Sequence, residues 1–221
     1  PVMRVTAPIQ EAQIIESFLL NTINVATTIC SKAARVVLAA GSRGVYDFSL
    51  RRTQGHHAAL VAARSSYIAG CQGTSNVLAG MLYGIPIVGT MAHSFIMSFR
   101  QEQESFRAYA STFPNNTILL VDTYDYKKGI KNAILIAREL EAKGHKLKAI
   151  RLDSGNLVKV SKFARCILDS HGLDYVKVLA SGNLDEFKIE RLIRSKAMID
   201  NFGVGTNMGV AVDAPYLDVI Y

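Results

Sequence analysis

This chain repeats a unit in which an apolar strand-like run is followed by a polar residue and then by a helical segment. Seven short, largely apolar runs each end in small or polar residues: VYDFSL, YIAGCQGTSN, IPIVGTMAH, TILLVDTY, KAIRLDSG, VKVLASGN and MIDNFGVGT. The polar ends of the last five are His93, Asp122, Asp153, Ser181 and Gly203. Their spacing of roughly 20–30 residues suits a strand plus its returning helix. The pattern predicts parallel strands joined by right-handed crossovers.

The segments between these runs carry helical periodicity. Apolar residues recur at i, i+3, i+4 and i+7 within 130–140 and 157–168, and Gly144 and Gly172 are expected to end the two helices. Asn183 is expected to cap the next helix. An open doubly wound sheet and a closed barrel both fit this alternation. Seven strands that are apolar throughout, each with one helix, favour the barrel.

The composition indicates one globular domain, which we assign to residues 1–221. Hydrophobic residues make up 49% of the chain and charged residues 19%, which excludes a disordered protein. No apolar run approaches the ~20 residues of a membrane span, and residues 1–20 lack the pattern of a signal peptide. We therefore expect no membrane association. The chain opens with Pro1 rather than Met, and we expect it to be part of a longer protein.

Cysteine usage and charge bear on compartment and partners. Cys30, Cys71 and Cys166 are widely spaced among apolar neighbours, which predicts reduced, packed thiols and a cytoplasmic protein, not a disulfide or a metal site. The net charge of +7 is spread along the chain without interleaved aromatics, so no nucleic-acid groove is predicted. Solvated helix faces and an anionic small substrate both remain explanations of this charge.

Chemistry-bearing side chains stand at the predicted strand ends. In a barrel, the carboxyl ends of all strands meet at one face, where catalytic groups gather. His93 would then face Asp122 and Asp153. Taken singly, the histidine could be a packed residue, and each aspartate could be a helix N-cap.

Two arginine-containing motifs suit anionic ligands. Arg151 and Asp153 lie two residues apart on one strand and therefore on the same side; such charges need each other, a ligand, or both. Arg51 and Arg52 follow Phe48 in DFSLRR. A guanidinium group matches the oxygens of phosphate or carboxylate, although a pair of surface arginines and a core Phe48 are the simpler alternatives.

Two glycine-bearing turns, SGN at 181–183 and GVGT at 203–206, follow late strands. Backbone N–H groups in such turns can bind phosphate, and phosphate sites of barrels often lie on late strands. We expect an anion between Arg51 and these two turns. The candidate binding residues there are Ser181, Gly182, Asn183, Gly203, Gly205 and Thr206.

The motifs, in this order and spacing, resemble one family. DFSLRRTQG, GTSN, GTMAHSF, LLVDTYD, RLDSGNL, SGNLDE and FGVGT are similar to segments of nicotinate phosphoribosyltransferases, and residues 1–40 resemble the entering strand and long helix of that family. The resemblance implies the TIM-like (β/α) barrel of type II phosphoribosyltransferases, incomplete here at both termini. It also implies a homodimer in the full-length protein.

The resemblance further implies a reaction of NAD salvage, catalysed by an ATP-coupled ligase and glycosyltransferase. Nicotinate and 5-phosphoribosyl 1-diphosphate would give nicotinate mononucleotide and diphosphate, with Mg²⁺ present and coupled ATP hydrolysis. By the same resemblance, His93 would be a phosphohistidine, which suits a neutral imidazole nucleophile.

The resemblance also gives the other site residues their roles. Thr90 and Arg151 would hold nicotinate, with Arg151 on its carboxylate, and Phe48 would stack near the pyridine ring. Arg51 and Thr206 would contact the phosphoribosyl donor. The aspartates at 122 and 153 would order Mg²⁺, ribose or neighbouring bases.

Two departures from the family keep alternatives open. Asn156 stands where the family usually has Asp, and the N-terminal domain that supplies an aromatic residue to the pyridine site is absent from this sequence. Nicotinamide specificity, a non-catalytic phosphoribosyl-binding homologue, and a truncated fragment that is inactive alone therefore remain. Without the resemblance, an aldolase-like barrel acting on a phosphorylated sugar would be the fallback.

Overall fold

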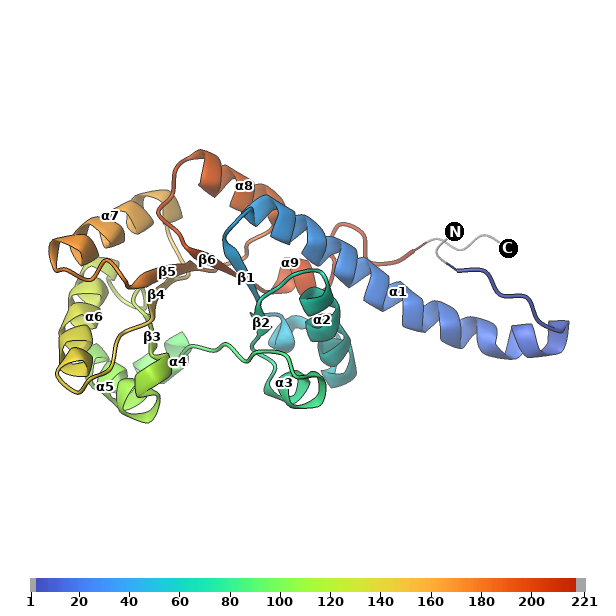
Figure 1. The fold of residues 1–221 in the computed structure, drawn as a ribbon, viewed down its shortest axis with the longest axis horizontal. Coiled ribbons are helices and arrows are strands. Elements are labelled where there is room, and N and C mark those ends of the chain that lie inside the picture. The colour runs from blue at the N-terminus through green and yellow to red at the C-terminus, as the bar shows by residue number, and fades with distance from the viewer. Residues whose placement is uncertain (1–2, 218–221) are drawn as a thin grey trace.

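A curled, fully parallel sheet forms the centre of the molecule (Figure 1). The computed structural model describes residues 3–217. Within them the strands are β1 (Gly44–Asp47), β2 (Gly73–Thr74), β3 (Ile118–Leu120), β4 (Ala149–Leu152), β5 (Lys177–Ala180) and β6 (Asn201–Val204). The order across the sheet is β2-β1-β6-β5-β4-β3. This arrangement confirms the predicted parallel α/β fold, in the form of a half-barrel.

Helices cover the outside of the curl. They are α1 (Ile9–Ala40), α2 (His56–Ile68), α3 (Val77–Tyr83), α4 (His93–Met97), α5 (Glu102–Thr112), α6 (Tyr126–Glu141), α7 (Leu157–Ser170), α8 (Glu186–Arg194) and α9 (Thr206–Gly209). Two short 3-10 helices are η1 (Leu50–Arg52) and η2 (Pro114–Asn116). Because every strand pair is parallel, the carboxyl ends of the strands meet on one side of the sheet.

The helix predictions at 130–140 and 157–168 are confirmed by α6 and α7. The apolar stripe of α6 is buried against the sheet, where Ile130, Ala133, Ala137 and Leu140 join the main core. Gly144 follows the helix at a φ of 78°, a left-handed conformation that glycine adopts without strain. Strand–helix packing of this kind fixes where each strand ends, and hence where the polar residues after it lie.

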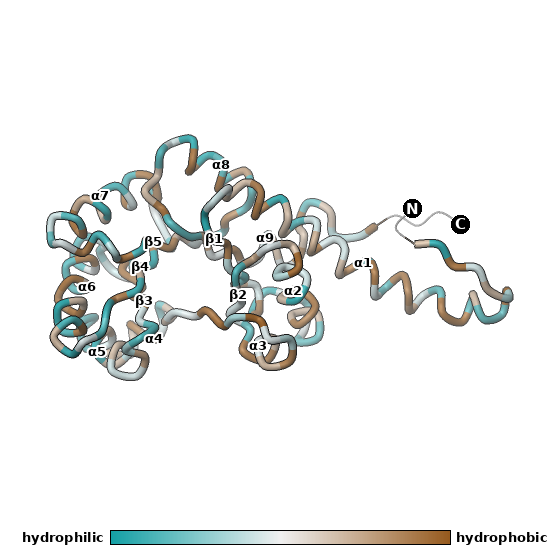
Figure 2. The backbone as a smooth tube through the Cα atoms, viewed as in Figure 1, coloured by the Kyte–Doolittle hydropathy of each residue, from teal (hydrophilic) through white to brown (hydrophobic). Residues whose placement is uncertain are grey.

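The long helix α1 serves as a core element at its C-terminal half. Ala33, Val36 and Ala40 are buried there, and Lys32 forms a buried ion pair with Glu186 of α8. By length and composition alone, α1 is long and apolar enough to cross a membrane. Sequence analysis overlooked this property, which the core helix of a soluble protein can also have. Its N-terminal half extends away from the sheet and alternates apolar and polar residues (Figure 2).

One predicted strand is wrong. Residues 85–88 form no strand and only an isolated parallel bridge, from Ile87 to Thr74 of β2. Pro86 lacks an N–H group and cannot donate to a neighbouring strand. Figure 1 shows this segment running between α3 and α4, and it pairs with no strand on the β3 side. The sheet of the described residues is therefore open between β2 and β3, and the closed barrel is not seen.

Three smaller expectations also fail. Residues 3–8 form no entering strand before α1; residues 1–2 lie outside the described part. The cap of α8 is Asp185, whose carboxylate accepts from the N–H of Lys188, instead of Asn183. Cys166 is exposed rather than packed, although all three cysteines are free thiols as expected.

Candidate active site

Two adjoining cavities lie at the carboxyl ends of the strands. The first, of ≈ 450 Å³, is lined by Phe48, Leu50, Arg51, Ser75, Gly89, Thr90, Met91, Ala92, His93, Ser94 and Arg151. The second, of ≈ 260 Å³, is lined by Phe48, Arg51, Arg52, Arg151, Asp153, Ser181, Gly182, Asn183, Gly203, Gly205 and Thr206. Both cavities therefore share Phe48, Arg51 and Arg151. Every candidate site residue except Asp122 lines one of them.

Arg151, on β4, is fixed by three side-chain hydrogen bonds. Its Nε donates to Ser181 Oγ at 2.7 Å, its Nη1 to Thr90 Oγ1 at 2.9 Å and its Nη2 to Asp153 Oδ1 at 2.7 Å. The guanidinium carbon lies 5.5 Å from the centre of the Phe48 ring. A guanidinium group has five N–H donors, so two remain for a ligand. The group is thus fixed in orientation and still able to bind an anion.

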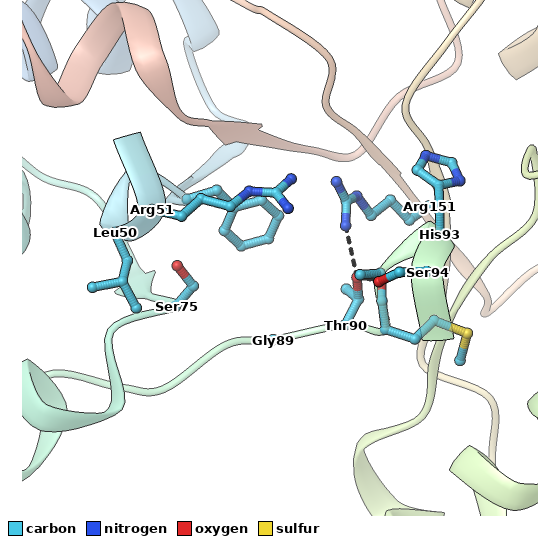
Figure 3. Close-up of a pocket in the computed structure, with 11 residues that line it drawn as sticks. Leu50, Arg51, Ser75, Gly89, Thr90, His93, Ser94 and Arg151 are labelled. Carbon is cyan, nitrogen blue, oxygen red and sulfur yellow. Dashed lines mark hydrogen bonds between the residues drawn. The ribbon is translucent and has the colours of Figure 1, made fainter. Parts of the chain in front are cut away.

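Arg51 faces Arg151 across the first cavity (Figure 3). Arg51 lies on η1, just after β1, and the ion pairs among the described residues do not include it. Two guanidinium groups that face one cavity repel each other unless an anion lies between or beside them. The arrangement therefore suits a ligand with at least one negative group.

Asp153 links the arginine to the histidine. Its Oδ1 accepts from Arg151 and from Ser181 Oγ, and its Oδ2 lies 3.4 Å from Nε2 of His93. Burial opposes ionisation of this carboxyl, but the charge of Arg151 and the hydrogen bonds from Ser181, Arg151 and His93 outweigh it, so the pKa of Asp153 lies below its ordinary value. Asp153 is therefore a charged acceptor at neutral pH.

His93 begins α4 and is held at both ring nitrogens. Its Nδ1 lies 3.0 Å from Thr123 Oγ1, and its Nε2 faces Asp153. The side chain is still 39% exposed, so a reagent can reach it. Sequence analysis missed Thr123, although its position directly after Asp122 at a strand end was a signal.

Asp122 lines neither cavity and instead holds the backbone that follows β4. Its Oδ2 accepts hydrogen bonds from the N–H of Asp153, from the N–H of Ser154 and from Ser154 Oγ, at 2.7 to 2.8 Å. Its Oδ1 is buried and has no hydrogen-bond partner among the described residues. No contact between Asp122 and His93 is seen; instead, the aspartate fixes the turn between β4 and α7. Neither Asp122 nor Asp153 is a helix cap, a role that Asp125 and Asn156 fill.

Asn156 has a local structural role. Its Oδ1 accepts from the N–H of Lys159 and caps α7. Aspartate and asparagine cap helices about equally well, so this contact is compatible with either residue.

The glycine turns have steric reasons for their composition. Gly182 has a φ of 97°, and a Cβ there would collide with the carbonyl oxygen of Asp153. A Cβ on Gly203 would meet the ring of Phe48. The two glycines thus let the backbone pack closely around the second cavity. Asn183 has a φ of 51° and accepts from Asn207 Nδ2 at both its backbone and side-chain oxygens.

A third acid near the site is Asp47, at the end of β1, which sequence analysis did not single out. It is buried, accepts from the N–H and Oγ of Ser49 and from Thr74 Oγ1, and so anchors the turn that presents Phe48 and Arg51. Burial raises the pKa of this carboxyl, although the hydrogen bonds from Ser49 and Thr74 oppose the rise. Its signal was a charged residue in an otherwise apolar run.

Comparison with known proteins gives a consistent set of relatives. Nicotinate phosphoribosyltransferase pncB2 of Mycobacterium tuberculosis is 49% identical over 221 residues, covering 100% of this chain and 47% of the relative. Nicotinate phosphoribosyltransferase of Bacillus subtilis is 43% identical over 222 residues, covering 100% of this chain and 45% of the relative. The chain therefore spans about half the length of the curated relatives it matches.

The structural comparison agrees. The crystal structure of human nicotinic acid phosphoribosyltransferase matches with a TM-score of 0.79 and 29% identity, over 90% of this chain and 51% of the human one. The model of the nicotinate phosphoribosyltransferase (NAPRTase) family matches residues 44–216, which include both cavities and every candidate site residue. The chain belongs to the nicotinate phosphoribosyltransferase family.

Proposed function

We propose that the full-length protein is a nicotinate phosphoribosyltransferase of NAD salvage. It converts nicotinate and 5-phosphoribosyl 1-diphosphate into nicotinate mononucleotide and diphosphate. The observation that carries the proposal is the pair of facing guanidinium groups, Arg51 and Arg151, shared by two adjoining cavities. One cavity suits a flat carboxylate and the other a phosphorylated sugar, so the two substrates would meet between them.

Nicotinate would occupy the first cavity. The two unused N–H groups of Arg151 match the two oxygens of a carboxylate, and the Phe48 ring offers a face for the pyridine. The fixed guanidinium favours an acid over the neutral amide of nicotinamide, since an amide supplies one acceptor and an N–H that would point at a cation.

The phosphoribosyl donor would occupy the second cavity. Arg51 and Arg52 supply positive charge there, and the turns at 181–183 and 203–206 supply backbone N–H groups. Departure of diphosphate from the sugar creates positive charge at the anomeric carbon and negative charge on the leaving group. Arg51 would stabilise the leaving diphosphate, and Asp153, which lines the second cavity, would stabilise the positive charge at the anomeric carbon.

Mg²⁺ and ATP belong to the same proposal. The described residues contain no cluster of three or more acidic, His or Cys side chains for a metal, but Mg²⁺ commonly takes one or two carboxylates plus water and phosphate oxygens. The buried Oδ1 of Asp122 has no partner among the described residues, but Asp122 lines neither cavity. Mg²⁺ would therefore enter with the phosphate oxygens of the donor and neutralise their charge. ATP would phosphorylate His93, whose ring is exposed at the rim of the first cavity.

We further propose a complete TIM-like barrel, a homodimer and a cytoplasmic location for the full-length protein. The open sheet between β2 and β3 and the span of about half the relatives' length support the first. Exposed apolar residues on α1, such as Ile14 and Phe18, support a face that is covered in an assembly. The free thiols are compatible with a reducing compartment.

The test is product formation by the purified full-length protein. With 5-phosphoribosyl 1-diphosphate, Mg²⁺ and ATP, we expect nicotinate mononucleotide from nicotinate and at least 100-fold lower kcat/KM with nicotinamide. A preference for nicotinamide would replace the proposed substrate. Calorimetric binding of the donor without any nucleotide product would instead support a non-catalytic homologue.

A further inference from the structure

The imidazole of His93 is held between the ends of two neighbouring strands. Thr123, directly after Asp122 beyond β3, lies against Nδ1 at 3.0 Å, and Asp153, beyond β4, lies against Nε2 at 3.4 Å. A ring contacted at both nitrogens has its rotation about the side chain fixed. The threonine is the one member of this set to which the proposed function gives no role.

The direction of the two hydrogen bonds follows from the acceptors. The carboxylate of Asp153 already accepts from Arg151 and Ser181, and an ionised carboxylate can only accept. Nε2 must therefore carry a proton when it bonds to Asp153. In the neutral ring Nδ1 then has a lone pair, and the Thr123 hydroxyl donates to it.

We propose that Thr123 is a positioning residue that presents Nδ1 of His93 as the nitrogen that reacts with ATP. The proposal rests on the proposed phosphorylation of His93. The lone pair of Nδ1 forms a bond to the γ-phosphorus while the bond to the β–γ bridging oxygen breaks. ADP leaves with that electron pair, and the Nε2 proton stays with the ring beside Asp153. The threonine hydroxyl, released from Nδ1, donates to an oxygen of the transferred phosphoryl group.

The chain offers a matched pair of variants. Thr123→Val keeps the branched shape of the side chain and removes the hydroxyl, whereas Thr123→Ser keeps the hydroxyl. Because Thr123 is only half-buried, beyond the end of β3, neither variant is expected to lower the thermal melting temperature measurably. A difference between the two variants therefore reports on the hydroxyl.

The first measurement uses the full-length protein with γ-labelled ATP and Mg²⁺, and determines the rate of labelling and the isomer of phosphohistidine. Wild type and Thr123→Ser should carry the phosphoryl group on Nδ1. Thr123→Val should label at least tenfold more slowly or yield a mixture of isomers. Equal rates and the same isomer in all three proteins would overturn the positioning role. An unlabelled wild type would count against His93 phosphorylation in the proposed function.

The second measurement needs no ATP. In ¹⁵N-labelled protein, two-bond proton–nitrogen NMR spectra identify which ring nitrogen of His93 carries the proton and whether the other accepts a hydrogen bond. We expect the proton on Nε2 and a hydrogen-bonded Nδ1 in wild type and Thr123→Ser, with the Nδ1 resonance displaced in Thr123→Val. The proposal would be refuted by an Nδ1 resonance that Thr123→Val leaves unchanged, or by a proton on Nδ1 in wild type. This result does not depend on whether ATP phosphorylates His93.

Discussion

The two arginines that face each other in the site are held in opposite ways. The side chain of Arg151 is 13% exposed and is fixed by three hydrogen bonds and an aromatic ring. Arg51 stands on a short 3-10 helix and takes part in none of the ion pairs of the described residues. A cation that is held in one orientation favours a ligand of one shape. A cation without an ion-pair partner can instead follow a leaving group, such as diphosphate, as negative charge builds up on it. On this difference rests our proposal that Arg151 recognises the flat acid and Arg51 recognises phosphate.

The largest expected effect follows from changing Arg151. Arg151→Lys keeps the charge but loses the planar donor set, and Thr90, Ser181 and Asp153 each lose the hydrogen bond that Arg151 donates. We expect kcat/KM for nicotinate to fall about 1,000-fold, from a loss of about 4 kcal/mol. Steady-state kinetics of the full-length protein measure it. A fall below tenfold would contradict the assigned recognition role.

Arg51→Lys should have a smaller effect, directed at the other substrate. Because Arg51 is not locked into a network, an ammonium group can replace part of its charge. We expect the KM for 5-phosphoribosyl 1-diphosphate to rise about 10-fold while the KM for nicotinate changes less than threefold. The comparison between the arginines fails if the nicotinate KM rises more than that of the donor.

Ser181→Ala would weaken the support of Arg151 without removing the arginine. The Oγ of Ser181 accepts from Arg151 Nε and donates to Asp153. Loss of both contacts should cost about 1–1.5 kcal/mol of transition-state stabilisation, or about 5- to 12-fold in kcat/KM. The KM for nicotinate should carry most of the change. Unaltered kinetics would mean that Arg151 needs no support from this serine.

The smallest effect comes from an ion pair outside the site. Hydrogen bonding from Lys32 is the main cause that lowers the pKa of Asp213 to about 2, against partial burial, with help from Arg35. A depressed folded-state pKa stabilises the fold above about pH 4, the ordinary value of Asp, and this contribution is lost as pH falls toward 2.

Asp213→Asn should accordingly lower the free energy of unfolding by about 0.5 kcal/mol at pH 6, with a smaller difference at pH 3. Denaturant unfolding at both values measures this. The nicotinate KM should not change, which makes the variant a control for the site variants. A difference that grows on acidification would have the wrong sign for this ion pair.

The parallel α/β fold could be predicted from the sequence because apolar periodicity marks strands and helices over many residues. The clustering of the strand-end residues followed, because parallel strands end on one side of the sheet. The prediction from sequence failed where a single local contact determines whether a strand or a helix cap forms. The run 85–88 has the apolar pattern of a strand, yet Pro86 cannot donate and pairing exists on the β2 side alone. Similarly, Asn183 and Asp185 are both competent caps, but α8 begins directly after Asp185, and Asn183 has a left-handed backbone instead of the extended one of a cap.

Side-chain networks were harder to foresee than positions. The pairing of Arg151 with Asp153 followed from their spacing on one strand. The contacts of Arg151 with Thr90 and Ser181, 61 and 30 residues away in sequence, depend on how the strands are arranged around the curl. The contact of Thr123 with His93 likewise depends on the rotation of the His93 ring, which the sequence does not give.

A crystal structure of the full-length protein with nicotinate and diphosphate would show directly which arginine binds which ligand. We expect the carboxylate of nicotinate on the free N–H groups of Arg151, its ring beside Phe48, and diphosphate near Arg51 and the 181–183 turn. Nicotinate bound with its carboxylate away from Arg151, or diphosphate outside the second cavity, would contradict these assignments.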